Sequence, residues 1–194
     1  MRTETAALPA NATLVAIDLQ AAIDAPYWAK DGPRNNPGAE RTIARLLAAW
    51  RRTSRPVMHV RHDSAEPDSA YRPGRPGNAF KPEVRPLEGE TVLPKHTTDA
   101  FVGTGLEERL RAAGQTVPAI CGVITDNSVE ATACGAGNRG FRAYVVEDAC
   151  FTFAKRDFAG TVRSAGEVHA MSLANLDGEY ATVVRADAVL AALP

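Results

Sequence analysis

Three polar residues that could transfer protons or attack a substrate each lie at the end of an apolar segment. Asp18 ends the run 13–18, Lys95 ends the run 91–95, and Ser128 lies between the run 117–123 and a helix-like stretch of small residues. At a helix N-terminus, free N–H groups and the helix dipole favour negative charge. Position 128 therefore suits a nucleophile that becomes anionic, or a reaction that builds an oxyanion.

The elements that must position these residues alternate between strand and helix patterns. Apolar runs predict strands, and the spacing i, i+3, i+4, i+7 of Ile43, Leu46, Leu47 and Trp50 predicts a helix over 37–52. Continuous apolar strands separated by helices indicate a parallel sheet covered on both faces. The predicted strands are 13–18, 56–61, 91–95, 117–123, 141–146 and 181–185, and the other predicted helices are 106–113, 128–138 and 158–173.

Length and composition favour one enzyme-sized domain over residues 1–194, with a loose N-terminal segment at 1–12. A net charge of −1 gives no indication of a nucleic-acid partner. No apolar run reaches the roughly 20 residues that span a bilayer, so we expect no membrane partner. The three cysteines lack metal-type spacing and are interpreted as reduced thiols of a cytoplasmic protein.

A long segment, 62–90, is rich in proline and glycine and cannot form a regular helix or a central strand. Loops of this length inside a domain are usually functional or disordered. We hypothesise that the loop covers the substrate pocket or a neighbouring subunit. A passive surface loop is the alternative.

Four short segments together resemble one known family. They are 16–20 (AIDLQ), 94–95 (PK), 122–129 (GVITDNSV) and 146–149 (VEDA). In this order and at these separations they resemble the isochorismatase-like, or cysteine hydrolase, family, which includes nicotinamidases, N-carbamoylsarcosine amidohydrolases and isochorismatases proper. The resemblance implies a doubly wound, three-layer α/β sandwich with a mainly parallel six-stranded sheet of order 3-2-1-4-5-6. In that order strands 1 and 4 are neighbours, so Asp18 and Ser128 should meet at one cleft.

The resemblance also implies the roles of the site residues. Asp18 would be the general base and acid, Lys95 its cationic partner, and position 128 the nucleophile. The backbone N–H groups of Ile124 and Ser128 would form the oxyanion hole, and the peptide between Val123 and Ile124 would be cis. The substrate would be a small molecule with an amide or related C–N bond. We expect no cofactor, and a homodimer or homotetramer.

Ser128 departs from the cysteine that hydrolytic members usually carry at this position. A cysteine would ionise readily beside Lys95, whereas a serine hydroxyl is much harder to deprotonate. Three explanations stay open: an engineered replacement of cysteine, a native serine nucleophile, or a reaction without a covalent step. In the last case Asp18 would act as an acid on a vinyl ether, as in isochorismatases proper. A catalytically silent binding subunit is a further alternative.

Other residues are weaker candidates. Gln20 could contact substrate or make a structural hydrogen bond, and Asn127 could contact substrate or cap a helix. His59 and His62 lie where nicotinamidases bind a metal, but the Asp-x-His signature of those enzymes is absent, so no metal is expected. His169 is interpreted as a core or interface residue. Aromatic candidates for the pocket wall are Tyr27, Trp28, Phe80 and Phe101.

Overall fold

A six-stranded parallel sheet forms the centre of the molecule. The computed structural model describes residues 8, 9 and 11–193, so the expected loose segment 1–12 falls largely outside the described residues. The sheet order is β3-β2-β1-β4-β5-β8, and every neighbouring pair is parallel. This confirms the order expected from the resemblance, with β8 as the sixth strand. The strands are β1 (Thr13–Ile17), β2 (Val57–His62), β3 (Thr91–Lys95), β4 (Pro118–Val123), β5 (Ala143–Phe151) and β8 (Ala181–Val184).

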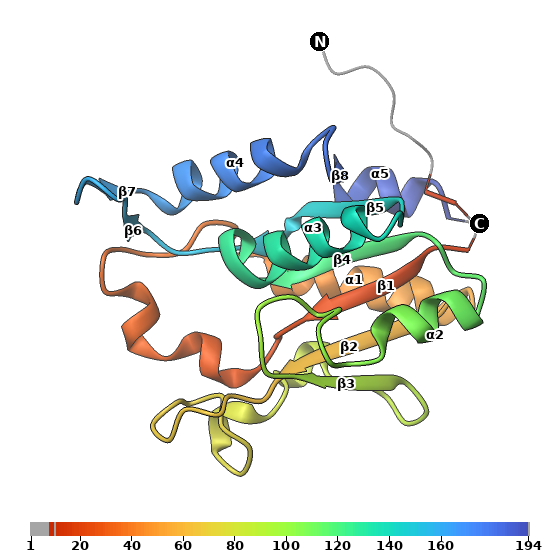
Figure 1. The fold of residues 1–194 in the computed structure, drawn as a ribbon, viewed down its shortest axis with the longest axis horizontal. Coiled ribbons are helices and arrows are strands. Elements are labelled where there is room, and N and C mark those ends of the chain that lie inside the picture. Colours follow the sequence, from red (N-terminus) through yellow and green to blue (C-terminus); the bar gives the residue numbers. More distant parts are fainter. Residues whose placement is uncertain (1–7, 10, 194) are drawn as a thin grey trace.

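Helices cover both faces of the sheet, as Figure 1 shows. The helices α1 (Ala39–Arg52) and α5 (Ala186–Ala191) pack on one face, where Leu14 and Ala16 of β1 join their apolar core. The helices α2 (Leu106–Ala112), α3 (Glu130–Asn138) and α4 (Ala165–Leu176) pack on the other face, against Val15 and Ile17. Successive side chains of a strand point to opposite faces, so the uniformly apolar β1 serves both cores.

The segment between β2 and β3 is irregular but firmly attached. It contains two short 3-10 turns, Pro76–Asn78 and Pro82–Val84. The buried amide of Asn78 donates to the carbonyl oxygens of His62 (3.2 Å) and Tyr71 (2.7 Å) and to the Asp63 carboxylate (2.9 Å). These bonds fix the loop against the carboxyl end of the sheet.

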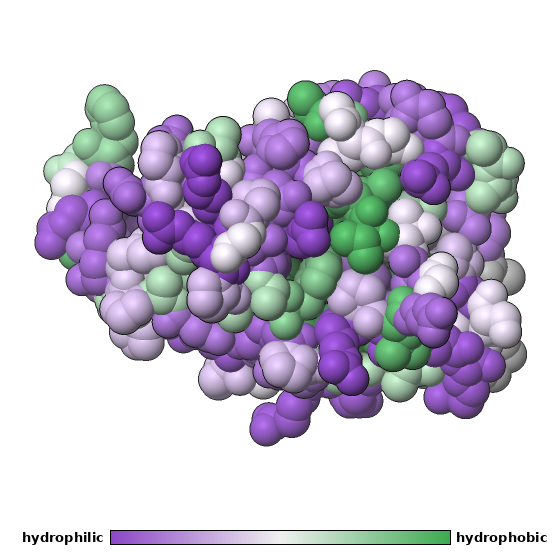
Figure 2. All heavy atoms as spheres, turned by 90° about the horizontal axis from the view of Figure 1, so that it is seen from below, coloured by the Kyte–Doolittle hydropathy of each residue, from purple (hydrophilic) through white to green (hydrophobic). Residues whose placement is uncertain are grey.

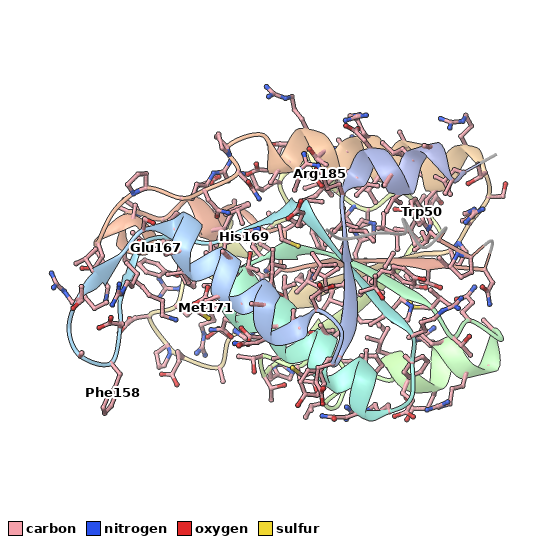
Figure 3. The ribbon with its side chains drawn as sticks, turned by 90° about the horizontal axis from the view of Figure 1, so that it is seen from above. Trp50, Phe158, Glu167, His169, Met171 and Arg185 are labelled. Atoms are coloured by element: carbon pink, nitrogen blue, oxygen red, sulfur yellow. The ribbon has the colours of Figure 1, made fainter. Side chains whose placement is uncertain are left out.

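The predicted helix 158–173 is wrong at its start. A two-stranded antiparallel hairpin of β6 (Lys155–Arg156) and β7 (Val162–Arg163) precedes α4. The Asp157 carboxylate accepts from the N–H groups of Ala159 and Thr161 and so stabilises the turn. Ser164 and Glu167 then form a capping box that sets the first turn of α4. Phe158 projects from the hairpin tip, away from the rest of the molecule (Figure 3).

The edge strand β3 and the loop beside it lie on the face shown in Figure 2. Hydrophilic residues cover most of this face, and hydrophobic residues form separate areas on it. Pro94 removes a hydrogen-bond donor from the edge, which discourages pairing with another strand. Within the part of the chain that the structure describes, no helix is both long and apolar enough to cross a bilayer.

Candidate active site

The three candidate residues converge at the carboxyl edge of the sheet. Asp18 directly follows β1 in a left-handed backbone conformation, with φ of 53°. Ser128 lies in a wide turn, Thr125–Val129, that connects β4 to α3. Lys95 is the last residue of β3 and pairs in register with His62 of β2. Because β2 separates β3 from β1, the long lysine side chain is what brings an amino group to Asp18.

The Lys95 ammonium group connects the other two residues. Its Nζ lies 2.7 Å from Oδ2 of Asp18 and donates to Oγ of Ser128 at 3.1 Å. It also donates to the carbonyl oxygen of Thr97 at 2.9 Å. The side chain of Lys95 is fully buried, and Asp18 and Ser128 are buried as well. The second carboxylate oxygen of Asp18, Oδ1, has no hydrogen-bond partner among the described residues.

Burial makes the Asp18 carboxyl group hard to ionise. Desolvation raises the pKa of Asp18 to about 6, although the Lys95 charge and hydrogen bonds from Lys95 and Ser128 lower it in part. A carboxyl group with this pKa can both accept and return a proton near neutral pH.

His62 completes the surroundings of Lys95, and the sequence did not identify it as part of this site. Burial and then the Lys95 charge lower the pKa of His62 to about 4, so the ring is neutral at neutral pH. Its Nδ1 lies 3.5 Å from Nζ of Lys95 and can accept a hydrogen bond from it. Its position in the chain could have indicated this role, because His62 ends the strand next to the strand that ends in Lys95.

Asp18 and Ser128 open into a small cavity of about 220 Å³. Aromatic side chains form much of its wall: Trp28 lies 5.0 Å from Tyr27 and 6.4 Å from Tyr71, measured between ring centroids. Tyr71 belongs to the 62–90 loop, so this loop does contribute to the wall. Three of the candidates named from the sequence, Asn127, Tyr27 and Trp28, line the cavity. The remaining lining residues are Ile23, His62, Ser69, Thr98, Val123 and Ile124.

The backbone beside Ser128 has an unusual geometry. The peptide between Val123 and Ile124 is cis, in agreement with the expectation from the resemblance. The Ile124 carbonyl accepts from the N–H groups of Asn127 (3.1 Å) and Val129 (3.3 Å). Ile124 itself lines the cavity, next to Val123 and Ser128.

Three predicted pocket residues do not line the cavity. The fully buried amide of Gln20 bonds to both backbone polar groups of His62 and to the Asn78 carbonyl, so it anchors the loop. Phe80 packs edge-on against His59, with 5.8 Å between ring centroids. Phe101 packs against Phe141 in the core at 5.5 Å. We interpret these side chains as structural. Alternation along a strand or loop predicts which side a residue faces, but it does not predict which residues lie beside it.

The other histidines have structural partners. His59 Nε2 lies 2.9 Å from a carboxylate oxygen of Glu90, and His169 Nδ1 lies 2.8 Å from the Thr125 hydroxyl. Across the described residues, no three His, Cys, Asp or Glu side chains are grouped so that they could hold a metal ion.

Comparison with known proteins agrees with the geometry. Residues 12–188 match the family model described as isochorismatase domain. The chain belongs to the isochorismatase family. A crystal structure of an isochorismatase-family hydrolase from Chromobacterium violaceum superposes with a TM-score of 0.91, at 57% identity, over 94% of this chain and 93% of that chain.

Curated relatives extend the comparison to named reactions. The uncharacterized isochorismatase family protein YrdC of Bacillus subtilis is 36% identical over 91% of this chain and 93% of its own length. A streptothricin hydrolase of Streptomyces noursei is 35% identical over 91% of this chain and 63% of that protein. A maleamate amidohydrolase of Pseudomonas putida is 34% identical over 60% of this chain and 50% of that protein. The protein is therefore an isochorismatase-family hydrolase.

Proposed function

We propose that this protein hydrolyses the C–N bond of a small amide through a covalent intermediate on Ser128. One observation carries the proposal: a buried ammonium group, Lys95 Nζ, holds Asp18 at 2.7 Å and Ser128 at 3.1 Å on a cavity of about 220 Å³. A nucleophile, a proton carrier and a cation in one buried place are what acyl transfer requires. The names of the amidohydrolase and streptothricin hydrolase relatives support the same class of reaction.

In the first half of the reaction, the amide carbonyl binds with its oxygen towards the N–H groups of Ile124 and Ser128. The ionised Asp18 carboxylate removes the Ser128 hydroxyl proton while Oγ forms a bond to the carbonyl carbon. The carbonyl π electrons move to oxygen, and the two N–H groups stabilise the resulting oxyanion. Asp18 then gives its proton to the amine nitrogen, the C–N bond breaks, and an acyl ester of Ser128 remains.

In the second half, water enters the place left by the amine. Asp18 removes a proton from the water, whose oxygen attacks the ester carbon. The Ser128–acyl bond breaks, Asp18 returns the proton to Oγ, and the carboxylic acid leaves. Lys95 stays protonated throughout and stabilises the negative charge that moves between Asp18 and Oγ.

A second function is favoured by one observation. The raised pKa of Asp18, about 6, and its unpartnered Oδ1 also suit a carboxylic acid that protonates a substrate. Such an acid could cleave a vinyl ether without any covalent step, in the manner implied by the resemblance to isochorismatases proper. Ser128 would then only line the cavity.

Replacement of Ser128 separates the two functions. We expect Ser128→Ala to lower turnover of a panel of small primary amides by at least about 10³-fold, because no nucleophile remains. Ser128→Cys should retain or raise it, since a thiol ionises more readily beside Lys95. Vinyl-ether hydrolysis that survives in Ser128→Ala would replace the amide proposal with the acid mechanism. Absence of turnover by all three proteins would favour the silent binding subunit.

The codon at position 128 of the source gene tests whether serine is an engineered replacement.

We further propose that the chain acts in the cytoplasm as a homodimer or homotetramer. The three cysteines are free thiols, as in proteins of reducing compartments.

Phe158 is fully exposed, and Met171 of α4 is 66% exposed at the same end of the molecule (Figure 3). Contiguous exposed apolar surface often marks an interface, and we propose that these two side chains contribute to one. Light scattering should report an oligomer that Phe158→Ser weakens, whereas the control Leu87→Ser leaves it intact. A monomeric wild-type protein would contradict this.

A further inference from the structure

A second cavity adjoins the one that contains Asp18 and Ser128. It has a volume of about 260 Å³ and shares Tyr27, Trp28, Ile124 and Asn127 with the first cavity. Pockets that bind small molecules usually measure about 300–1,000 Å³. The first cavity, at about 220 Å³, is below this range, whereas the two cavities together fall inside it. A substrate that fills both would place its reacting amide beside Ser128 and a second group beyond Trp28.

The floor of the second cavity is aromatic. The Trp28 and Phe153 rings are stacked, with 6.0 Å between centroids and 21° between planes. The Tyr27 ring also contacts Trp28, with 5.0 Å between centroids. Flat or aliphatic groups bind well on such a surface because they displace water from it. This surface therefore suits a substrate whose middle part is apolar.

The lining of the second cavity carries an excess of positive charge. Lys30, Lys155 and Asp126 are its charged residues. Both oxygens of Asp126 are occupied, one by the Thr152 hydroxyl and the other by the Lys155 ammonium group. Lys30 forms no ion pair with the described residues. A cationic ligand would find Asp126 already neutralised, whereas an anionic ligand could pair with Lys30.

We propose that the second cavity binds an anionic end of the substrate, which makes the substrate an amide that carries a carboxylate at its other end. Lys30 is the residue that selects the carboxylate, and Lys155 supports it. The proposal rests on the proposed amide hydrolysis for the position of the reacting group, but the cavity and its charges are independent of the catalytic step.

Matched amide pairs test this selection. The probes are the mono-amides of succinic, glutaric, adipic and pimelic acids, each compared with the neutral straight-chain amide of the same length. At the best length we expect kcat/KM to favour the carboxylate by about fivefold at low salt, the size of a partly exposed charge pair. Lys30→Met should remove this preference and Lys30→Glu should reverse it. Arg52→Met is the control, since it removes an exposed positive charge at the C-terminus of α1 without touching either cavity.

Binding separates this inference from the proposed reaction. Calorimetry with Ser128→Ala and the same probes requires no turnover, and it should show the same preference and the same loss when Lys30→Met is added. Preferential binding without turnover by the wild-type protein would sustain the carboxylate site and contradict the amide reaction. Two results would overturn the carboxylate site. One is equal kcat/KM and equal affinity within every pair, and the other is a preference that persists in Lys30→Met and Lys30→Glu.

Discussion

At the scale of single residues, two opposite effects set the pKa of the Asp18 carboxyl group. Burial favours the neutral form of Asp18, and Lys95 at 2.7 Å favours the ionised form. The resulting pKa of about 6 leaves Asp18 ionised at neutral pH, yet more basic than an exposed aspartate. A stronger base is what a serine nucleophile requires, because its hydroxyl proton is difficult to remove. In the proposed reaction, the desolvated Asp18 would therefore partly offset the lower acidity of a serine hydroxyl compared with a cysteine thiol.

The pH dependence of amide hydrolysis tests this balance. The base form of Asp18 exists above its pKa, so kcat/KM should rise with pH and reach half of its plateau at about pH 6. Lys95→Met removes the positive charge that lowers this pKa, and the midpoint should therefore move to higher pH while the plateau falls. Stopped assays across the pH range with the wild-type protein, Lys95→Met and the control Arg52→Met measure both effects. A midpoint that stays in place in Lys95→Met would show that another group controls the rate.

At the scale of elements, the close approach of β1 and β4 fixes the distance between Asp18 and the Ser128 turn. Gly122 pairs with Ile17 across the two strands and has φ of 128°. A Cβ atom at position 122 would lie 2.2 Å from the Ile17 carbonyl oxygen, which is closer than any real contact. Asp18 directly follows Ile17, so the absence of a side chain at Gly122 keeps the carboxylate near Ser128.

Replacement of Gly122 should therefore affect both stability and activity. We expect Gly122→Ala to lower the free energy of unfolding by roughly 1–3 kcal/mol, from a strained φ and a clash with rigid backbone. Chemical denaturation measures the loss. Gly140→Ala is a matched control, since Gly140 also has a positive φ of 77° but no atom within 4 Å of the added Cβ. Equal losses in the two variants would show that φ alone, and not the approach of β1 to β4, sets the cost.

The sequence could predict the elements whose patterns repeat and could not predict the rest. Apolar strands with polar ends placed Asp18 and Ser128 near the same edge, and the resemblance added Lys95; all three meet in the structure. The hairpin before α4 was missed because a turn held by Asp157 has no periodicity. Tyr71 was missed for the same reason, since it lies in an irregular loop. Periodicity reports which face a residue occupies and gives no distances between distant loops.

At the scale of the whole molecule, buried carboxyl groups act on stability in opposite directions. Although burial opposes ionisation, hydrogen bonds from Arg34 and Lys81 lower the pKa of Glu40 to about 2. Glu40 therefore contributes stability that is present above about pH 4.5 and is lost as the pH falls towards 2. Asp18 does the reverse. Its folded pKa of about 6 exceeds the unfolded value of about 3.9, so its contribution is complete below about pH 4 and is lost as the pH rises through 6.

Comparison of the wild-type protein with Asp18→Asn isolates this contribution. Asparagine has the shape of the neutral acid and cannot ionise, and Glu40 titrates in both proteins. Relative to the wild-type protein, Asp18→Asn should gain roughly 2–3 kcal/mol of unfolding free energy between about pH 4 and about pH 8. Denaturant titrations at the two pH values measure the difference. A difference that is independent of pH would contradict the raised pKa, whatever its effect on activity.

The depth of Ser128 has a consequence for the cell that contains this enzyme. Ser128 is buried and lines a cavity of about 220 Å³ whose wall also contains Tyr27, Trp28 and Tyr71. A polypeptide backbone with its flanking side chains is too bulky to enter that space. In the proposed reaction, the nucleophile would therefore act on small amides and leave the peptide bonds of neighbouring proteins intact. The size of the cavity would then limit the reaction without an inhibitor or an inactive precursor.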